Sequence, residues 1–429
     1  MRLAVKIALG LAAVASTVHA AEPAQPTVLK AAYLFDSKTG KLVNGGAVVI
    51  EGDKIKAVGA QGAPANAKVI DLGDATLLPG FIDAHTHITS EIHDDYYHGF
   101  HTDMYRFSTE QAHYSAMYAK RTLDAGFTTI RNVGAGEFVD VGLRNAINSN
   151  IVPGPTILTA VHSIGSTGGH CDQGPFPPDR IEPLGIVDGV CNGADDCRAA
   201  VRYQLKWGAD VIKICSSGGV LSETDPVDVP QLTPEELNAI VSETHAWKRK
   251  VAAHSHGDVA ARQAVEAGVD SIEHGSFLSD ETLRLMKTKG TYLVPTRLAV
   301  FWVNKMAEKY PPAIAAKARS TFKEHERVFR SALKLGVPIA FGTDSGVSPH
   351  GMNAKEFALL VEIGMSPSAA LVSGTRESAK LLGIANEVGT LEAGKFADVV
   401  AVKGNVLNDI TSTEKPVFVM KRGQVVVQP

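Results

Sequence analysis

The feature that most constrains the fold is an alternation of short apolar segments with amphipathic segments of helical period. Eight apolar segments begin near residues 81, 128, 156, 210, 251, 269, 291 and 337. This order predicts parallel β-strands, each followed by a helix. Eight such units in roughly 300 residues indicate a closed (β/α)8 TIM barrel. An open doubly wound sheet is the alternative, but the glycine-rich phosphate turn that usually follows its first strand is absent.

The two ends of the chain have a different pattern. Short strand-like segments occur between residues 27 and 78, separated by Gly, Asp and Asn turns, and they return from residue 389 onward. We therefore expect residues 21–78 and 389–429 to form one small β-sandwich, which a barrel of residues 79–388 interrupts. The predicted fold class is α/β, a (β/α)8 barrel with a β-sandwich built from both chain ends.

Polar residues recur where the predicted barrel strands end. The first strand ends in a His-x-His pair, and side chains two apart on a strand point to the same face. In a barrel, all strands open on one face, where active sites lie. A single polar residue at such a place has an ordinary structural explanation, but six are hard to explain except as one site. The six are His85, His87, Lys213, His254, His274 and Asp344.

The chemistry of this set suits metal ions. Four histidines and a carboxylate are ligands that zinc accepts, with positions left open for water. Lys213 is the exception, because a protonated amine facing divalent cations is strongly unfavourable. Carboxylation by CO₂ would turn it into an anion able to bridge two metal ions. The ordinary alternative is a lysine that reaches past the strand end to solvent.

Several motifs resemble those of the amidohydrolase superfamily. They are Leu77–His87, Asp210–Ile214, His254, Glu273-His274-Gly275, Gly342-Thr343-Asp344 and the closing segment around Gly394 to Asp398. Further motifs resemble its imidazolonepropionase-related branch, namely Thr167–His170, Ser216–Gly219, Ala253–His256 and His350–Asn353. That branch includes binuclear zinc Xaa-Pro dipeptidases (prolidases), carboxypeptidases and ochratoxinase-like amidases. One departure is Asn132, where relatives often have Asp, but it lies outside the ligand set.

The resemblance implies a hydrolase with two Zn²⁺ ions per chain, bridged by carboxylated Lys213 and hydroxide. One ion would be bound by His85, His87 and Asp344. The other would be bound by His254 and His274. Asp344 would also be catalytic, taking a proton from the hydroxide and passing it to the leaving amine. Members of this branch commonly assemble into homo-oligomers, which we also expect here.

The expected substrate is a small-molecule amide or dipeptide. Prolidase-type cleavage of the amide bond to a C-terminal amino acid needs groups that hold the free carboxylate. His170, His256 and Arg297 are candidates, because they lie at or just beyond strand ends. N-acyl amino acids such as ochratoxin A are possible substrates of the same kind. Hydrolysis of a cyclic amide, as in imidazolonepropionase, is the alternative. A barrel that has lost catalysis is a further alternative, which the intact ligand set disfavours.

The N-terminus predicts export. Arg2 and Lys6 precede an apolar run, and small residues follow up to Ala20. This pattern is typical of a signal peptide over residues 1–20, so we expect a periplasmic or secreted protein. The formal net charge is −4 and no basic run is present, so neither nucleic acid nor an anionic membrane surface is an expected partner.

The chain has four cysteines, and an exported protein can form disulfides. Cys191 and Cys197 flank a turn-forming loop and are the favoured pair. Spacing alone does not decide the connectivity, so all three two-bridge patterns remain open. Cys215 lies two residues after Lys213 on the same predicted strand. It needs no catalytic role if a metal-activated hydroxide is the nucleophile.

Overall fold

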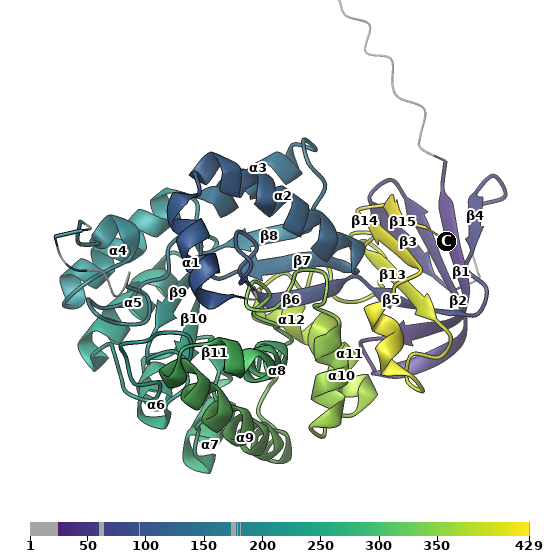
Figure 1. The fold of residues 1–429 in the computed structure, drawn as a ribbon. Helices are drawn as coiled ribbons and strands as arrows, with labels where there is room; N and C mark the ends of the chain where they lie inside the picture. The colour runs from purple at the N-terminus through teal and green to yellow at the C-terminus, as the bar shows by residue number, and fades with distance from the viewer. Residues whose placement is uncertain are drawn as a thin grey trace, which may run out of the picture.

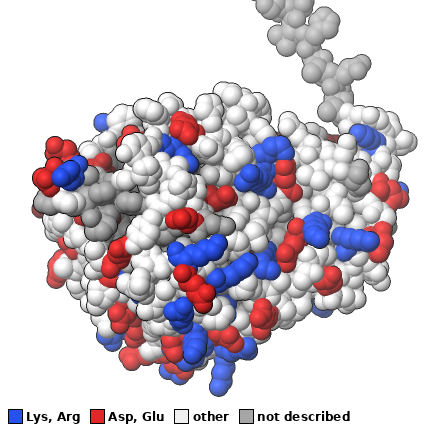
Figure 2. Space-filling view, in the orientation of Figure 1, with Lys and Arg blue, Asp and Glu red and all other residues white. Residues whose placement is uncertain are grey.

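The computed structural model describes residues 25–59, 64–93, 95–172, 177, 179–180 and 182–428. The predicted signal peptide lies outside the described residues. Among them, no helix combines the length and the hydropathy needed to cross a membrane. On the face shown in Figure 2, acidic and basic side chains are interspersed over the surface.

Both ends of the chain meet in one eight-stranded sheet, on the right in Figure 1. Its main path runs β15-β14-β13-β5-β1-β2-β3, and β4 pairs with β1. The N-terminal strands are β1 (Thr27–Asp36), β2 (Lys41–Glu51), β3 (Lys54–Val58), β4 (Lys68–Asp71) and β5 (Ala75–Pro79). The C-terminal strands are β13 (Val399–Lys403), β14 (Phe418–Lys421) and β15 (Gln424–Val427).

The two ends join where β13 pairs antiparallel with β5. We expected a small sandwich, and the ladder hydrogen bonds define a single sheet. An isolated antiparallel bridge from Lys54 to Phe396 brings β3 to the segment just before β13. The sheet therefore curls on itself, and one apolar cluster that includes Leu29, Val48 and Phe418 fills it.

In the central part of the chain, the described residues form seven parallel strands in two sheets, ordered β6-β7-β8 and β12-β11-β10-β9. Isolated parallel bridges join residues 164 and 214, 293 and 339, and 86 and 345. The strands are β6 (Phe81–Thr86), β7 (Phe127–Asn132), β8 (Thr156–Thr159), β9 (Val211–Cys215), β10 (Lys250–Ser255), β11 (Ser271–His274) and β12 (Tyr292–Val294).

The predicted eighth strand, near residues 337–341, is present only as an isolated bridge. Its residues still contact both neighbours: Ala340 N donates to Leu293 O of β12, and Ala84 N of β6 donates to Phe341 O. Proline has no N–H to donate to a ladder, and Pro338 takes part only through its carbonyl oxygen, which accepts from Leu293 N. The segment therefore lies between β12 and β6 without a continuous ladder.

Helices follow the central strands and pack around them (Figure 1). In the 24-residue α9, buried residues recur every three or four positions, as at Ile314, Ala318, Thr321 and His325, which is the pattern of one buried helical face. The helices are α1 (Tyr96–Tyr105), α2 (Ser108–Asp124), α3 (Val139–Asn148), α4 (Ala194–Lys206), α5 (Pro234–Ala246), α6 (Asp258–Ala267), α7 (Asp280–Lys289), α8 (Arg297–Met306), α9 (Pro312–Leu335), α10 (Lys355–Glu362), α11 (Pro367–Val372) and α12 (Ser378–Leu381).

Candidate active site

A cavity of about 520 Å³ lies at the C-terminal ends of the central strands. Polar side chains from β6, β9, β10 and β11 line it, and apolar side chains from later loops and helices form one wall. All six residues predicted as metal ligands line this cavity: His85, His87, Lys213, His254, His274 and Asp344. The apolar side chains include Val220, Leu221, Val300, Val303 and Val347.

Asp344 forms the first group with His85 of β6 and with His87, which directly follows that strand. Asp344 Oδ1 lies 3.3 Å from His85 Nε2 and 3.3 Å from His87 Nε2. Burial alone would raise the pKa of Asp344, but His85 and His87 lower it far below its ordinary value. The carboxylate is therefore ionised at any ordinary pH.

Two buried polar atoms of this group indicate that a further ligand binds between them. His85 Nε2 and Asp344 Oδ1 are buried, and neither has a hydrogen-bond partner among the described residues. Leaving such atoms unsatisfied costs about 1–3 kcal/mol each. A cation bound between a histidine nitrogen and a carboxylate oxygen would satisfy both atoms, so these residues fit a metal ion.

A second group of histidines lies beside the first. Possible ligand atoms of His254, His256 and His274 lie within 4.8 Å of one another, as do those of His85, His274 and Asp344. Burial lowers the pKa of His254 and His274 well below the ordinary value, and it lowers the pKa of His256 to about 3. All three rings are therefore neutral near pH 7 and can offer a lone pair to a metal.

Backbone strain also gathers at this site. His274 and Asp344 have φ angles of 70° and 58°, in the left-handed region that side chains other than glycine rarely adopt. Such conformations cost about 1–3 kcal/mol and persist where the surroundings hold them. Hydrogen bonds do so here, since His274 Nδ1 lies 2.7 Å from Thr296 Oγ1 and Asp344 N donates to His85 O over 2.7 Å.

Lys213 projects into the cavity from β9 and is buried. Burial lowers its pKa to about 8, against the opposing effect of Glu273 and Asp344. The neutral amine is therefore accessible at mildly alkaline pH, and only a neutral amine can react with CO₂. This environment is compatible with the predicted carboxylation.

Glu273 and Arg131 hold the first histidine in place. His85 Nδ1 lies 2.7 Å from Glu273 Oε2, and Arg131 donates to Glu273 Oε1 over 2.8 Å. The pKa of Glu273 falls to about 2, because Arg131 and His85 outweigh the effect of burial. Since an ionised carboxylate only accepts hydrogen bonds, the His85 proton must be on Nδ1. Nε2 then presents its lone pair to the cavity.

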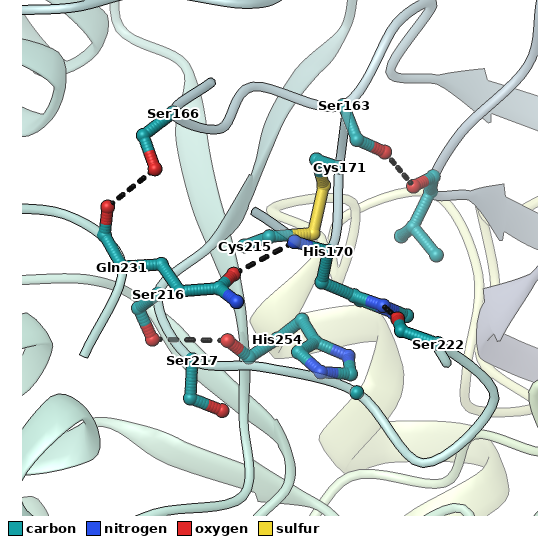
Figure 3. The surroundings of a disulfide bond; sticks show 12 residues. Ser163, Ser166, His170, Cys171, Cys215, Ser216, Ser217, Ser222, Gln231 and His254 are labelled. Carbon is teal, nitrogen blue, oxygen red and sulfur yellow. Dashed lines mark hydrogen bonds between the residues drawn. A yellow bond between two sulfur atoms is a disulfide. The ribbon is translucent and has the colours of Figure 1, made fainter. Parts of the chain in front are cut away.

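A disulfide lies beside the histidine cluster, as Figure 3 shows. It joins Cys171, next to His170, to Cys215 at the end of β9. The ring of His170 lies over that of His254, with centroids 4.3 Å apart. Its Nδ1 lies 2.5 Å from Ser222 Oγ, and its backbone N–H donates to Gln231 Oε1 over 2.8 Å. The other disulfide joins Cys191 to Cys197, so the favoured pair is confirmed.

The sequence profile of the amidohydrolase family matches residues 76–426 of this chain. The chain belongs to the amidohydrolase family. It is similar to the ochratoxinase of Aspergillus niger, with 32% identity over 426 residues that cover 93% of this chain and 85% of the relative. It is also similar to the imidazolonepropionase of Cutibacterium acnes, with 26% identity and coverage of 84% of each chain.

Solved structures support the same relationship. The structure of a Xaa-Pro dipeptidase with methionine bound in its active site has a TM-score of 0.90, 39% identity, and coverage of 94% of this chain and 99% of that one. The Aspergillus niger ochratoxinase structure has a TM-score of 0.82, 30% identity, and coverage of 95% and 97%. The resemblance to amidohydrolases with prolidase-like and ochratoxinase-like members is therefore confirmed.

The predicted substrate-binding residues of this amidohydrolase have different surroundings. His170 and His256 line the cavity, and His256 Nδ1 lies 2.8 Å from Ser276 Oγ. Arg297 does not reach the cavity. As the first residue of α8, it packs its guanidinium over the Phe322 ring and donates to Phe322 O, so the proposed contact with substrate is not supported for this residue.

Two residues of the site were not expected from the sequence to have a role. Arg131 and Glu273 both lie inside apolar strands, and both are buried. Charged residues are almost never buried unless they are paired. An Arg and a Glu within two apolar strands of the central part of the chain were therefore an available signal of a buried ion pair. Asn132, the departure noted above, accepts from Ile88 N and donates to Asp140, so it has a structural role at the end of β7.

Proposed function

We propose that this amidohydrolase cleaves the amide bond to a C-terminal amino acid that carries a free carboxylate. Dipeptides of the Xaa-Pro kind and N-acyl amino acids such as ochratoxin A are the proposed substrates. Two zinc ions would be bound, one by His85, His87 and Asp344 and the other by His254 and His274. Carboxylated Lys213 would bridge them. The ring of His256 lies close to the rings of His254 and His274. His256 would therefore be either a ligand of the second ion or a contact for the substrate.

The observation that carries this proposal is the unsatisfied pair of buried atoms on His85 and Asp344, at the floor of a cavity with neutral histidines on one side. When bound there, zinc supplies a hydroxide at neutral pH and polarises the substrate carbonyl. Asp344 is ionised and lies on the cavity floor. It can therefore accept the proton of the attacking water and deliver it to the amine that leaves.

The substrate class rests on the relatives and on His170. The names of similar proteins include a Xaa-Pro dipeptidase with bound methionine and an ochratoxinase. Burial lowers the pKa of His170 to about 4, so its ring is neutral near pH 7. Its Nδ1 is directed to Ser222, which leaves Nε2 as the atom that could donate a hydrogen bond to a carboxylate. In this arrangement Ser222 Oγ would donate to Nδ1, and the proton of the neutral ring would be on Nε2.

We also propose the larger organisation of the molecule. The two central sheets and the segment after Pro338 would act as one closed (β/α)8 barrel of residues 79–388, with residues 21–78 and 389–429 as a separate domain. Export through the signal peptide of residues 1–20 remains a prediction. A homo-oligomer is supported by Met104, Tyr105 and Phe107, which are all more than half exposed, because clustered exposed apolar side chains often mark interfaces.

The test compares substrates with a free carboxylate and with a carboxamide. Zinc-loaded enzyme is assayed on an N-acyl amino acid and on its C-terminal amide. Loss of a charge-assisted contact should lower kcat/KM by about 100-fold, on the order of 3 kcal/mol. His170→Ala should remove most of this discrimination, with the free acid losing most activity. His113→Ala, at an exposed position on α2, is the matched control.

Two results would contradict the proposal. Equal rates on the acid and the amide would show that no group of the site binds the substrate carboxylate. Turnover of imidazolonepropionate alone would favour a cyclic-amide hydrolase, which the similarity to the Cutibacterium acnes imidazolonepropionase keeps as the second candidate.

A further inference from the structure

A single lysine of α9 holds one loop of the cavity. Lys317 Nζ donates to three backbone carbonyl oxygens, those of Gly219 at 3.1 Å, Ser222 at 2.7 Å and Asp225 at 2.5 Å. A lysine ammonium has three N–H donors, so this loop uses all of them. We call residues 219–225 the β9 loop, since it follows β9.

The β9 loop contains no helix or strand, yet it forms part of the cavity wall. Val220 and Leu221 line the cavity. Both pack against an apolar cluster of α8 and α9 that includes Val303, Ile314 and Ala318. The shape of this wall therefore depends on the position of a loop that has no ladder hydrogen bonds. Lys317 of α9 provides hydrogen bonds that hold the loop against the helix.

The same loop also contacts His170. Ser222 Oγ is the partner of His170 Nδ1. The backbone at Gly219 approaches the ring so closely that a Cβ atom there would lie 2.1 Å from His170 Cε1. Asp225 links the loop to His170 through Gln231. Asp225 Oδ2 accepts from Gly219 N over 3.0 Å and from Gln231 Nε2 over 2.9 Å. Gln231 Oε1 in turn accepts from His170 N. A shift of the loop would thus move the surroundings of His170.

We propose that Lys317 is a positioning residue that determines substrate specificity. By fixing the β9 loop, it holds Val220 and Leu221 as an apolar surface beside the group that His170 binds. Because Ser222 contacts His170 directly, the apolar surface would lie next to the carboxylate that His170 is proposed to bind. The side chain of the released amino acid is the part of the substrate adjacent to that carboxylate. Lys317 therefore sets a preference for an apolar residue, such as leucine, over alanine, and this step rests on the proposed function of the site.

The charge of Lys317 suits this role. Its side chain is half-buried, and partial negative charges of three carbonyl oxygens surround the ammonium. Methionine has a similar length and no donor, so Lys317→Met removes the three hydrogen bonds with little change in volume. Lys323 lies on the same helix at an exposed position, and Lys323→Met is the matched control for the loss of one positive charge from α9.

The first measurement does not depend on activity. Glu223 is exposed in the middle of the β9 loop, so a glutamyl endopeptidase can report whether the loop opens. We expect Lys317→Met to be cut after Glu223 at least tenfold faster than the wild type and Lys323→Met. Equal cutting of all three proteins would overturn the inference, whatever the enzyme hydrolyses.

The second measurement compares N-acetyl-leucine with N-acetyl-alanine. In the wild type and Lys323→Met we expect a higher kcat/KM for the leucine substrate. In Lys317→Met the ratio should fall at least tenfold, because KM rises more for N-acetyl-leucine than for N-acetyl-alanine, while bound zinc stays within about twofold. An unchanged ratio in a variant that is cut faster would overturn the specificity role.

Leu221→Ala provides a second variant in case Lys317→Met does not fold. It shortens the apolar surface and leaves the Lys317 hydrogen bonds in place. It should lower the leucine-to-alanine ratio without faster cutting after Glu223, and an unchanged ratio would overturn the inference. If the wild type hydrolyses neither substrate, the proposed function fails. The cutting assay still tests whether Lys317 holds the loop.

Discussion

Replacement of Arg131 by methionine tests the buried ion pair that orients His85. Arg131 is 1% exposed and donates to Glu273 Oε1, to Ala84 O and to Ser271 Oγ. Methionine fills most of the same space without charge or donors. Glu273 would keep only His85 and Ser271 as partners, so a carboxylate would remain buried without its cation.

The expected magnitude follows from that buried charge. Breaking a buried pair by removal of one partner costs about 3–5 kcal/mol. The pKa of Glu273 leads to a similar figure, because it falls from 4.5 to about 2 in the folded protein, and each pKa unit corresponds to about 1.4 kcal/mol. For 429 residues, the entropy of unfolding is about 0.9 kcal/mol/K, so the Tm should fall by about 3–6 °C.

The pH dependence has a definite sign. A carboxyl whose folded pKa lies below its unfolded pKa stabilises the protein above the unfolded value, and that stability is lost as the pH falls toward the folded value. The contribution of Glu273 is therefore present above about pH 4.5 and lost toward pH 2. The difference in Tm between Arg131→Met and the wild type should thus shrink below pH 4.5, because a protonated Glu273 needs no cation.

Differential scanning fluorimetry from pH 3 to pH 7 measures this effect, and an exposed ion pair serves as control. Arg202 donates to both carboxylate oxygens of Glu243, at 2.8 and 3.0 Å, but its side chain is 60% exposed. Such exposed pairs contribute little to stability because water and salt screen them, so Arg202→Met should lower the Tm by about 1 °C or less. If Arg131→Met lowers it no further than this control, the reasoning is refuted. A double variant with Glu273→Gln should recover part of the loss.

Three further predictions concern the proposed chemistry and export. Asp344→Asn should lower kcat at least about 100-fold, the size expected when proton transfer is removed, with an unchanged circular dichroism spectrum; near-native kcat would exclude the proton-transfer role. Lys213→Ala should bind clearly less zinc per chain than the wild type by elemental analysis, and short carboxylic acids should partly restore its activity. Full zinc content with normal turnover would exclude the bridging role. Protein isolated from its native host should begin near residue 21 by N-terminal sequencing, and an intact Met1 would contradict export.

The positions of the candidate ligands could be predicted from the sequence because they follow apolar runs. His254 is the next-to-last residue of β10 and His274 is the last residue of β11, and neighbouring parallel strands bring their C-terminal ends to the same edge of a sheet. Lys213 could be placed in the same way from its position near the end of β9. The regular spacing of strands and helices carries this information, so no contact had to be known in advance.

Other features depend on contacts that no local pattern contains. The interruption after residue 337 arises from Pro338, whose effect on the ladder depends on what its neighbours offer. Arg297 looked like a carboxylate partner because it follows a strand, but the start of α8 directs it toward Phe322 instead. The bond between Cys171 and Cys215 joins residues 44 positions apart, and the hydrogen bonds of Lys317 to the β9 loop join residues 92 to 98 positions apart. The spacing of residues along the sequence predicts neither of these contacts.

The pairing of β5 with β13 has a consequence for biosynthesis. The paired residues Pro79 and Val399 are 320 positions apart, and ribosomes add about 5–20 residues per second. Synthesis of β13, the partner strand, therefore follows that of β5 by roughly 16–64 s, and this edge of β5 is unpaired until then. An unpaired edge strand is a template for aggregation during that time. The growing chain thus needs protection of this edge, for example by a chaperone, until the last strands have been made.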